Sequence, residues 1–201
     1  MKRYALWLVV LLFAVGSGQS VRSDDERGRP LRAKLSGAQE VNSKSTTGKG
    51  AFEARVNETD TAVDYKLEWQ DLEGATVLQS HIHFGQRGVN GGIMIWLCGS
   101  ASNPGPAGTP VCPGPLNGTL EGSFSAANVV GPADQGIAAT EFAEALKAIR
   151  SGLAYVNVHT DKFPGGEIRG QIRGKGFRPF DDVPGQAFGH DHSGRGGNNR
   201  D

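Results

Sequence analysis

Apolar and polar residues alternate along much of the chain between residues 31 and 173. The segments 52–56 (FEARV) and 63–69 (VDYKLEW) carry an apolar residue at every second position. A period of two is typical of β-strands that bury one face. Because the turn-forming sequence 57–60 (NETD) separates the two segments, we predict that they form a β-hairpin.

Three further segments have strand-like patterns. The segment 93–97 (IMIWL) is apolar at consecutive positions, which is typical of a central strand covered on both faces. The segments 153–159 (LAYVNVH) and 167–173 (EIRGQIR) are joined by the turn-forming residues 163–166 (FPGG). We therefore predict that they form a closing hairpin.

One short helix is predicted over residues 141–150. Phe142, Leu146 and Ile149 fall on one face at helical spacing, and Thr140 is placed to cap the first turn. Many short strands with a single helix indicate a mainly β fold. We expect an antiparallel β-sandwich or barrel, Greek-key-like in its connections, with one short helix.

The N-terminal segment has the features of a secretory signal peptide. Lys2 and Arg3 precede a 12-residue apolar run at 4–15, and small residues follow at 16–20. A membrane anchor is the alternative, but a helix that spans a bilayer needs about 20 apolar residues. We expect a signal peptide at 1–20 and a secreted, extracytoplasmic protein, periplasmic or extracellular, whose mature form has no stable membrane span.

Composition divides the rest of the chain into three parts. Residues 21–30 are polar and are expected to form a flexible linker, and residues 31–174 hold the patterned β domain. Residues 175–201 are rich in glycine and poor in apolar residues, so we expect a disordered polar tail. Basic and acidic residues number 21 each. This balance argues against a nucleic-acid partner, which requires a basic surface.

Cys98 and Cys112 are the only cysteines of the chain. In an oxidising compartment such a pair usually forms a disulfide, and closing a loop of about 15 residues would stabilise the fold by about 3 kcal/mol. Thiolate ligation of a metal is the alternative, but the close paired-cysteine spacing of zinc sites is missing. We therefore predict a disulfide between Cys98 and Cys112.

Histidines are the candidate chemical groups. His81 and His83 are two residues apart, so both point to the same face of a strand, and His159 lies on the more polar face of its own strand. Together these three imidazoles are a candidate site for copper or zinc. The alternative, which the sequence favours, is a structural hydrogen-bond network. His190 and His192 in the tail are at most a loose metal-binding tract.

Several polar residues accompany the histidines. Glu40, Glu167 and Arg169 lie within or beside strand-like segments, and Asn157 shares a strand face with His159. One interpretation is a polar binding surface. The favoured alternative is a solvated face with cross-strand ion pairs, because surface charges usually have that role. No nucleophile, phosphate-loop, dinucleotide or metalloprotease motif is present, so we expect no catalytic activity.

Four blocks of sequence resemble the CHRD domain, the module named after the extracellular protein chordin. They are LSGAQEV at 35–41, SHIHFG followed by NGGI at 80–93, YVNVHT at 155–160 and PGGEIRGQ at 164–171. One departure is that Asn and Ser follow the first block, where the family often has prolines. The resemblance implies an extracellular, β-rich domain and implies little about activity.

These observations leave three functional hypotheses in order of preference. The first is a secreted, non-catalytic binding or structural module of the envelope or extracellular space, with an unidentified partner there. The second is a copper- or zinc-binding protein that uses the three strand histidines. The third is a superoxide-dismutase-like activity, because a His-x-His pair on an exported β-sandwich is similar to copper-zinc superoxide dismutase. That family needs more ligands than His81, His83 and His159 supply.

Overall fold

The computed structural model describes residues 30–174 of the chain. The expected signal peptide, nearly all of the expected linker and the expected tail with His190 and His192 lie outside the described residues. No helix within residues 30–174 is long and apolar enough to cross a membrane.

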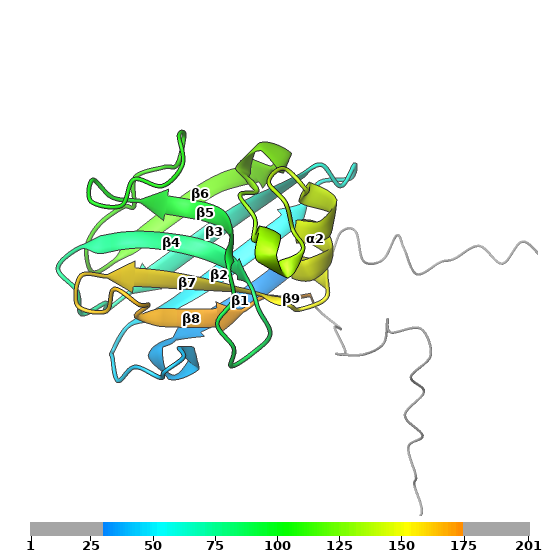
Figure 1. The fold of residues 1–201 in the computed structure, drawn as a ribbon. Coiled ribbons are helices and arrows are strands. Elements are labelled where there is room, and N and C mark those ends of the chain that lie inside the picture. The colour runs from blue at the N-terminus through cyan, green and yellow to red at the C-terminus, as the bar shows by residue number, and fades with distance from the viewer. Residues whose placement is uncertain (1–29, 175–201) are drawn as a thin grey trace, which may run out of the picture.

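Nine antiparallel strands form one sheet that curls into a nearly closed barrel (Figure 1). Along the sheet the strands follow the order β5-β4-β7-β8-β1-β2-β3-β6, and β9 pairs with β1. This arrangement decides between the predicted sandwich and barrel in favour of the barrel. The strands are β1 (Leu31–Ser36), β2 (Lys49–Val56), β3 (Ala62–Gln70), β4 (Val77–Phe84), β5 (Ile93–Gly99), β6 (Gly118–Ser125), β7 (Ala154–Thr160), β8 (Ile168–Gln171) and β9 (Arg173–Gly174).

Both predicted hairpins are present. β2 and β3 pair in register from Lys49 with Gln70 to Val56 with Val63. β7 and β8 pair across the predicted turn. Asn57 closes the β2–β3 turn because its Oδ1 accepts hydrogen bonds from the N–H groups of residues 61 and 62.

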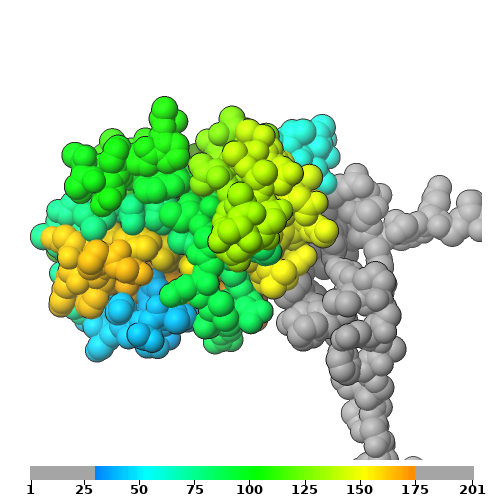
Figure 2. Space-filling view, viewed as in Figure 1, coloured from blue at the N-terminus to red at the C-terminus, as the bar shows by residue number. Residues whose placement is uncertain are grey.

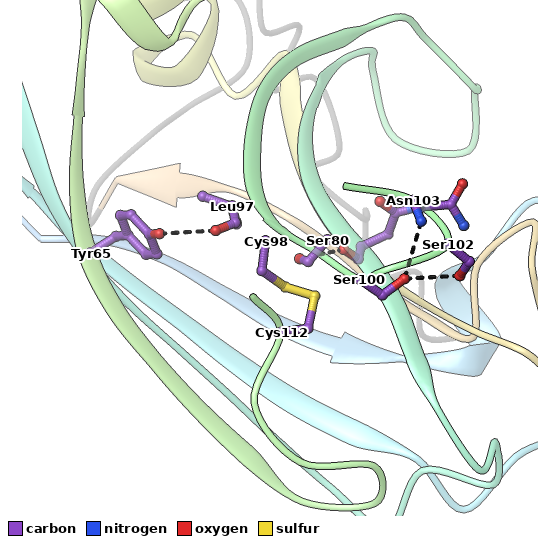
Figure 3. Close-up of a disulfide and its surroundings, with 9 residues drawn as sticks. Tyr65, Ser80, Leu97, Cys98, Ser100, Ser102, Asn103 and Cys112 are labelled. Carbon is purple, nitrogen blue, oxygen red and sulfur yellow. Dashed lines mark hydrogen bonds between the residues drawn. A yellow bond between two sulfur atoms is a disulfide. The ribbon is translucent and has the colours of Figure 1, made fainter. Parts of the chain in front are cut away.

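The interior of the barrel is apolar. Alternate residues of the strands point inward, and Val63, Leu67, Ile82, Leu97 and Val156 are completely buried. A few buried polar groups are hydrogen-bonded there: the Tyr65 hydroxyl reaches across the interior and donates to the Leu97 carbonyl at 3.4 Å, and the Ser80 hydroxyl donates to the Asn157 carbonyl. Figure 3 shows the bond of Tyr65 next to the disulfide.

The predicted strand at 93–97 lies at one end of the sheet order rather than in its centre. Its apolar character has a different cause, because later segments cover it. Ile95 bridges to Val129, the Val130 N–H donates to the Met94 carbonyl, and Gly99 bridges to Val111. These contacts shield the strand as neighbouring strands would. Periodicity alone therefore could not distinguish a central strand from an end strand that later segments cover.

The helix α2 (Phe142–Arg150) packs at one end of the barrel (Figure 1) and buries five apolar residues, including Phe142 and Ile149. It begins one residue later than predicted, and Thr140 is not its cap. Thr140 has φ 69°, and the Glu141 carboxylate instead accepts a hydrogen bond from the Ala138 N–H at 2.7 Å. At the other end, Arg150 forms a two-fold hydrogen-bonded ion pair with Asp60.

The predicted disulfide is present between Cys98 and Cys112 (Figure 3). It fastens the loop after β5 to the strand itself. Two backbone hydrogen bonds, from Gly99 to Pro110 and from Cys112 to Gly99, accompany the bond.

Candidate metal site

Three histidines converge on the outer face of the barrel. His81 and His83 project from β4 and His159 from the neighbouring β7, where His81 pairs with Asn157 and His83 with Tyr155. One ligand nitrogen from each ring lies within 4.8 Å of the others. The pairing of β4 with β5 shifts register on either side of His81 and Ile82, and such bulges change the direction of side chains near functional sites.

This face is polar but not exposed. His81, His83 and His159 are only 1%, 8% and 6% exposed, and Ile82 behind them fills the barrel interior. The segment that follows β4, residues 85–92, crosses this side of the molecule. In Figure 2 it is the green segment that runs down towards the blue N-terminal residues.

Two of the rings are held by backbone carbonyls. His83 Nδ1 lies 2.9 Å from the Gly91 carbonyl oxygen, and His159 Nδ1 lies 2.9 Å from that of Pro164. A carbonyl only accepts, so each Nδ1 carries the proton and donates it. In a neutral ring the lone pair is then on Nε2, and neither Nε2 has a hydrogen-bond partner in the described residues. Metal-ligating histidines are commonly oriented in this way.

Burial keeps the rings neutral. It lowers the pKa of His81 to about 2, with repulsion from His159 and His83 adding to the effect. Burial also lowers the pKa of His83 to about 4, although the Gly91 hydrogen bond partly opposes it. The pKa of His159 is lowered by burial too. All three are therefore unprotonated at neutral pH, which is the form that binds a metal ion.

Aromatic rings enclose the cluster on two sides. The Trp96 ring of β5 meets the His81 ring edge-on, with 4.2 Å between their centroids. Tyr155 stacks parallel to His83 at 4.7 Å. These contacts hold the imidazoles in place without supplying charge.

Arg169 supports the site through Tyr155, the ring that stacks on His83. Its guanidinium lies 3.4 Å from the centre of the Tyr155 ring, and it donates hydrogen bonds to the carbonyls of Gln86 and Val89 and to Asn90 Oδ1. Arg169 therefore fixes the segment 85–92, whose Gly91 carbonyl orients His83.

Gly91 itself is required to be small. A Cβ built on it would lie 1.7 Å from the Phe84 carbonyl oxygen. The segment 85–92 thus reaches His83 only because residue 91 has no side chain, and neither Gly91 nor the aromatic neighbours Trp96 and Tyr155 were identified from the sequence as part of the site. The NGGI block at 90–93 was the signal that could have indicated Gly91.

Glu40 is buried near Arg169. The burial raises the pKa of its carboxyl to about 7, and the positive charge of Arg169 opposes part of that rise. Glu40 is 4% exposed and its Oε1 has no hydrogen-bond partner in the described residues. It faces Gly166, which has φ 120° and where a Cβ would lie 2.5 Å from the carboxylate.

Glu167 is separate from the histidines and is fully bonded. Its Oε1 accepts from the Thr46 hydroxyl and the Glu73 N–H, and its Oε2 accepts from the Thr160 hydroxyl, each at 2.7 Å. This carboxylate therefore joins three segments of the fold.

The four polar residues do not form the solvent-facing surface that either sequence interpretation required. Glu40, Asn157, Glu167 and Arg169 are all at most 4% exposed. The reason is that the segments 37–48 and 85–92 fold over them, as the bonds of Glu167 to Thr46 and of Arg169 to Asn90 show. Neither segment has a periodic pattern that would have predicted its position.

A comparison with known protein families identifies the domain. The model of the CHRD domain matches residues 31–172. This chain belongs to the CHRD-domain family. No curated protein and no solved structure matches it. The CHRD match covers strands β1 to β8, including His81, His83 and His159, so the candidate site is built from the CHRD domain itself.

The blocks that resembled the CHRD domain meet at the candidate site. SHIHFG supplies two histidines, YVNVHT supplies the third with Tyr155, and PGGEIRGQ supplies Arg169 and the Pro164 carbonyl. In the CHRD domain described here, segments far apart in the sequence therefore share one location in the fold.

Proposed function

We propose that this CHRD domain is an exported, non-catalytic module that binds one copper or zinc ion between His81, His83 and His159. The observation that carries the proposal is the state of the ring nitrogens. Within hydrogen-bonding geometry, His83 Nδ1 and His159 Nδ1 have partners in the described residues, whereas both nitrogens of His81 and the Nε2 atoms of His83 and His159 have none. The Asn157 side chain lies close enough to His83 to raise its pKa, but it completes no hydrogen bond to Nε2.

A structural network, the interpretation favoured from the sequence, accounts poorly for that pattern. Buried polar groups are nearly always hydrogen-bonded, and each one left unpaired costs about 1–3 kcal/mol. Four unpaired nitrogens within one cluster would be an expensive way to stabilise a fold. A metal ion would accept three of these lone pairs at once.

Two further features support the remaining parts of the proposal. The Cys98–Cys112 disulfide is typical of proteins that mature in an oxidising compartment. The near-complete burial of the histidines favours holding an ion over exposing it to a substrate. The partner in the envelope or extracellular space is proposed only as a class. Superoxide-dismutase-like activity is not proposed, because the described residues hold a single three-histidine group.

Metal content provides the test. Tag-free protein is loaded with copper or zinc, passed through a desalting column and measured by mass spectrometry of the elements. We expect one ion per folded chain, and loss of that ion in His83→Gln. The matched control is His190→Gln/His192→Gln, which changes two histidines outside the described residues and should keep the ion.

The competing outcomes are distinct. Wild-type protein that is folded by circular dichroism but retains neither metal would refute the proposal. So would loss of the ion in the tail variant, because the tail would then be the binding site. If His83→Gln does not fold, His159→Gln provides the same comparison on the other strand.

A further inference from the structure

We infer that this site selects the monovalent ion Cu(I) over Zn(II), an inference that rests on the proposed function. The decisive feature is the charge of the ligand group. It consists of three imidazoles, with no carboxylate and no thiolate among the described residues close enough to join them. Imidazole binds both copper and zinc, so the type of donor does not separate the two ions.

The acidic and thiol groups that would neutralise a dication are bound elsewhere. Glu40 lies beside Arg169, and Glu167 is hydrogen-bonded to Thr46, Glu73 and Thr160. Cys98 follows shortly after Trp96 in β5, but its sulfur is in the disulfide. A metal ion in this cluster would therefore keep its full positive charge.

Burial makes that charge decisive. The three rings are at most 8% exposed, and the cost of moving an ion from water into a poorly polar interior rises with the square of its charge. For a dication this cost is about four times that for a monocation of similar size. Arg169, stacked on the Tyr155 ring beside His83, places another positive charge nearby.

Coordination geometry points in the same direction. Structural Zn(II) sites are almost always four-coordinate and closed by protein ligands. Here the rings of Trp96 and Tyr155 border His81 and His83. A further polar side chain beside His83 is that of Asn157, which is neutral and adds no charge to the ligand group. Cu(I) forms stable complexes with fewer than four ligands, and three neutral nitrogen atoms are enough to coordinate it.

Competition titrations under anaerobic conditions test the inference. Cu(I) is titrated against the chelator bicinchoninate, and Zn(II) against a chromophoric zinc chelator. We expect Cu(I) to bind one equivalent per chain with a dissociation constant at least about tenfold below that of Zn(II).

A charge substitution gives the sharper comparison. Asn157 is directly opposite His81 across the β4–β7 pair and its Oδ1 has no partner in the described residues. In Asn157→Asp a carboxylate would attract Zn(II) twice as strongly as Cu(I), so the preference for Cu(I) should fall by about tenfold. The matched control is Asn117→Asp on the exposed connection before β6, which should leave the preference unchanged.

Each outcome has one meaning. Zn(II) binding as tight as or tighter than Cu(I) binding would overturn the inference and leave metal binding intact. Failure of the folded wild-type protein to bind either ion would overturn the proposed function as well. An unchanged ratio in folded Asn157→Asp would contradict the charge argument. If that variant does not fold, the wild-type titrations still decide the preference.

Discussion

At the scale of single residues, His81 is the histidine of the site with the fewest hydrogen bonds. It is 1% exposed, neither of its ring nitrogens has a hydrogen-bond partner in the described residues, and its neighbours are two other imidazoles and Trp96. A buried residue whose role is to bind a metal is expected to reduce the stability of the metal-free protein, because its ligand atoms then have no partner.

His81→Phe tests this expectation. Phenylalanine is close to histidine in shape and has no polar atom to leave unpaired, so the metal-free protein should be stabilised by about 1 kcal/mol. The same change should abolish metal binding. Equilibrium unfolding in urea measures the first effect. A loss of 2 kcal/mol or more, roughly the value of a disrupted buried network, would show that His81 serves the fold.

The pH dependence of stability follows from the lowered pKa values. As the pH falls below 6.5, the histidines of the unfolded chain become protonated while those of the native protein stay neutral. The reason is that the native pKa is about 4 for His83 and about 2 for His81. The stability of the metal-free protein should therefore fall from pH 6.5 towards pH 4. Glu40 acts in the opposite sense, because its raised pKa favours the native state below pH 7.

Comparing wild type with His81→Phe removes the contribution of Glu40, which is present in both. Between pH 6.5 and 4 the wild type should lose stability relative to the variant by about 1.4 kcal/mol per pH unit. Urea unfolding at a series of pH values provides the measurement. A difference that does not vary with pH would mean that native His81 takes up a proton as readily as the unfolded chain does.

At the scale of elements, two strands and one connecting segment build the site. Period-two alternation correctly placed His81 and His83 on one face of β4. The sequence could not place His159 beside them, because the pairing of β4 with β7 is a long-range contact that no local pattern encodes. It also could not predict that residues 85–92 would be held over this face by Arg169 and by the Tyr155 hydroxyl, which accepts from the Gly91 N–H.

Arg169→Lys should loosen that segment. Lysine keeps the charge but loses the planar stacking on Tyr155 and the forked hydrogen bonds. We expect amide hydrogen exchange at residues 86–91 to become at least about tenfold faster. This acceleration corresponds to a decrease of about 1.4 kcal/mol in the free energy of local opening.

The matched control is Arg150→Lys, which removes a comparable forked contact with Asp60 at the far end of α2. It should leave exchange at residues 86–91 unchanged. Equal acceleration in both variants would indicate general destabilisation instead of a local role for Arg169.

At the scale of the whole molecule, the apolar interior and the polar outer face of the barrel were both visible in the sequence. The sequence did not indicate that part of the outer face is buried. Glu40, Asn157 and Arg169 have the composition of a surface, and only the folded positions of the segments 37–48 and 85–92 bury them. Aperiodic loops carry no signal of where they will lie. The sequence therefore led us to expect a solvated face, with a binding surface as the alternative, where the structure has a covered cluster.

The disulfide contributes at this scale because it closes the loop that packs on Trp96, where Gly105 lies against the ring. Cys98→Ala/Cys112→Ala should lower the free energy of unfolding by about 3 kcal/mol. Chemical denaturation measures the loss, with wild-type protein under reducing conditions as the control. Unchanged stability would mean that the loop is already fixed by its backbone hydrogen bonds.

The three-histidine metal site is tested most directly by the ligand environment of the bound ion. X-ray absorption spectroscopy at the copper edge of Cu(I)-loaded protein reports the atoms that contact the metal. If the three histidines hold the ion, the spectrum will show a shell of nitrogen atoms with the outer-shell scattering of three imidazoles, and this pattern will be lost in His81→Phe. A shell containing sulfur, or one of oxygen atoms without imidazole scattering, would contradict the three-histidine site.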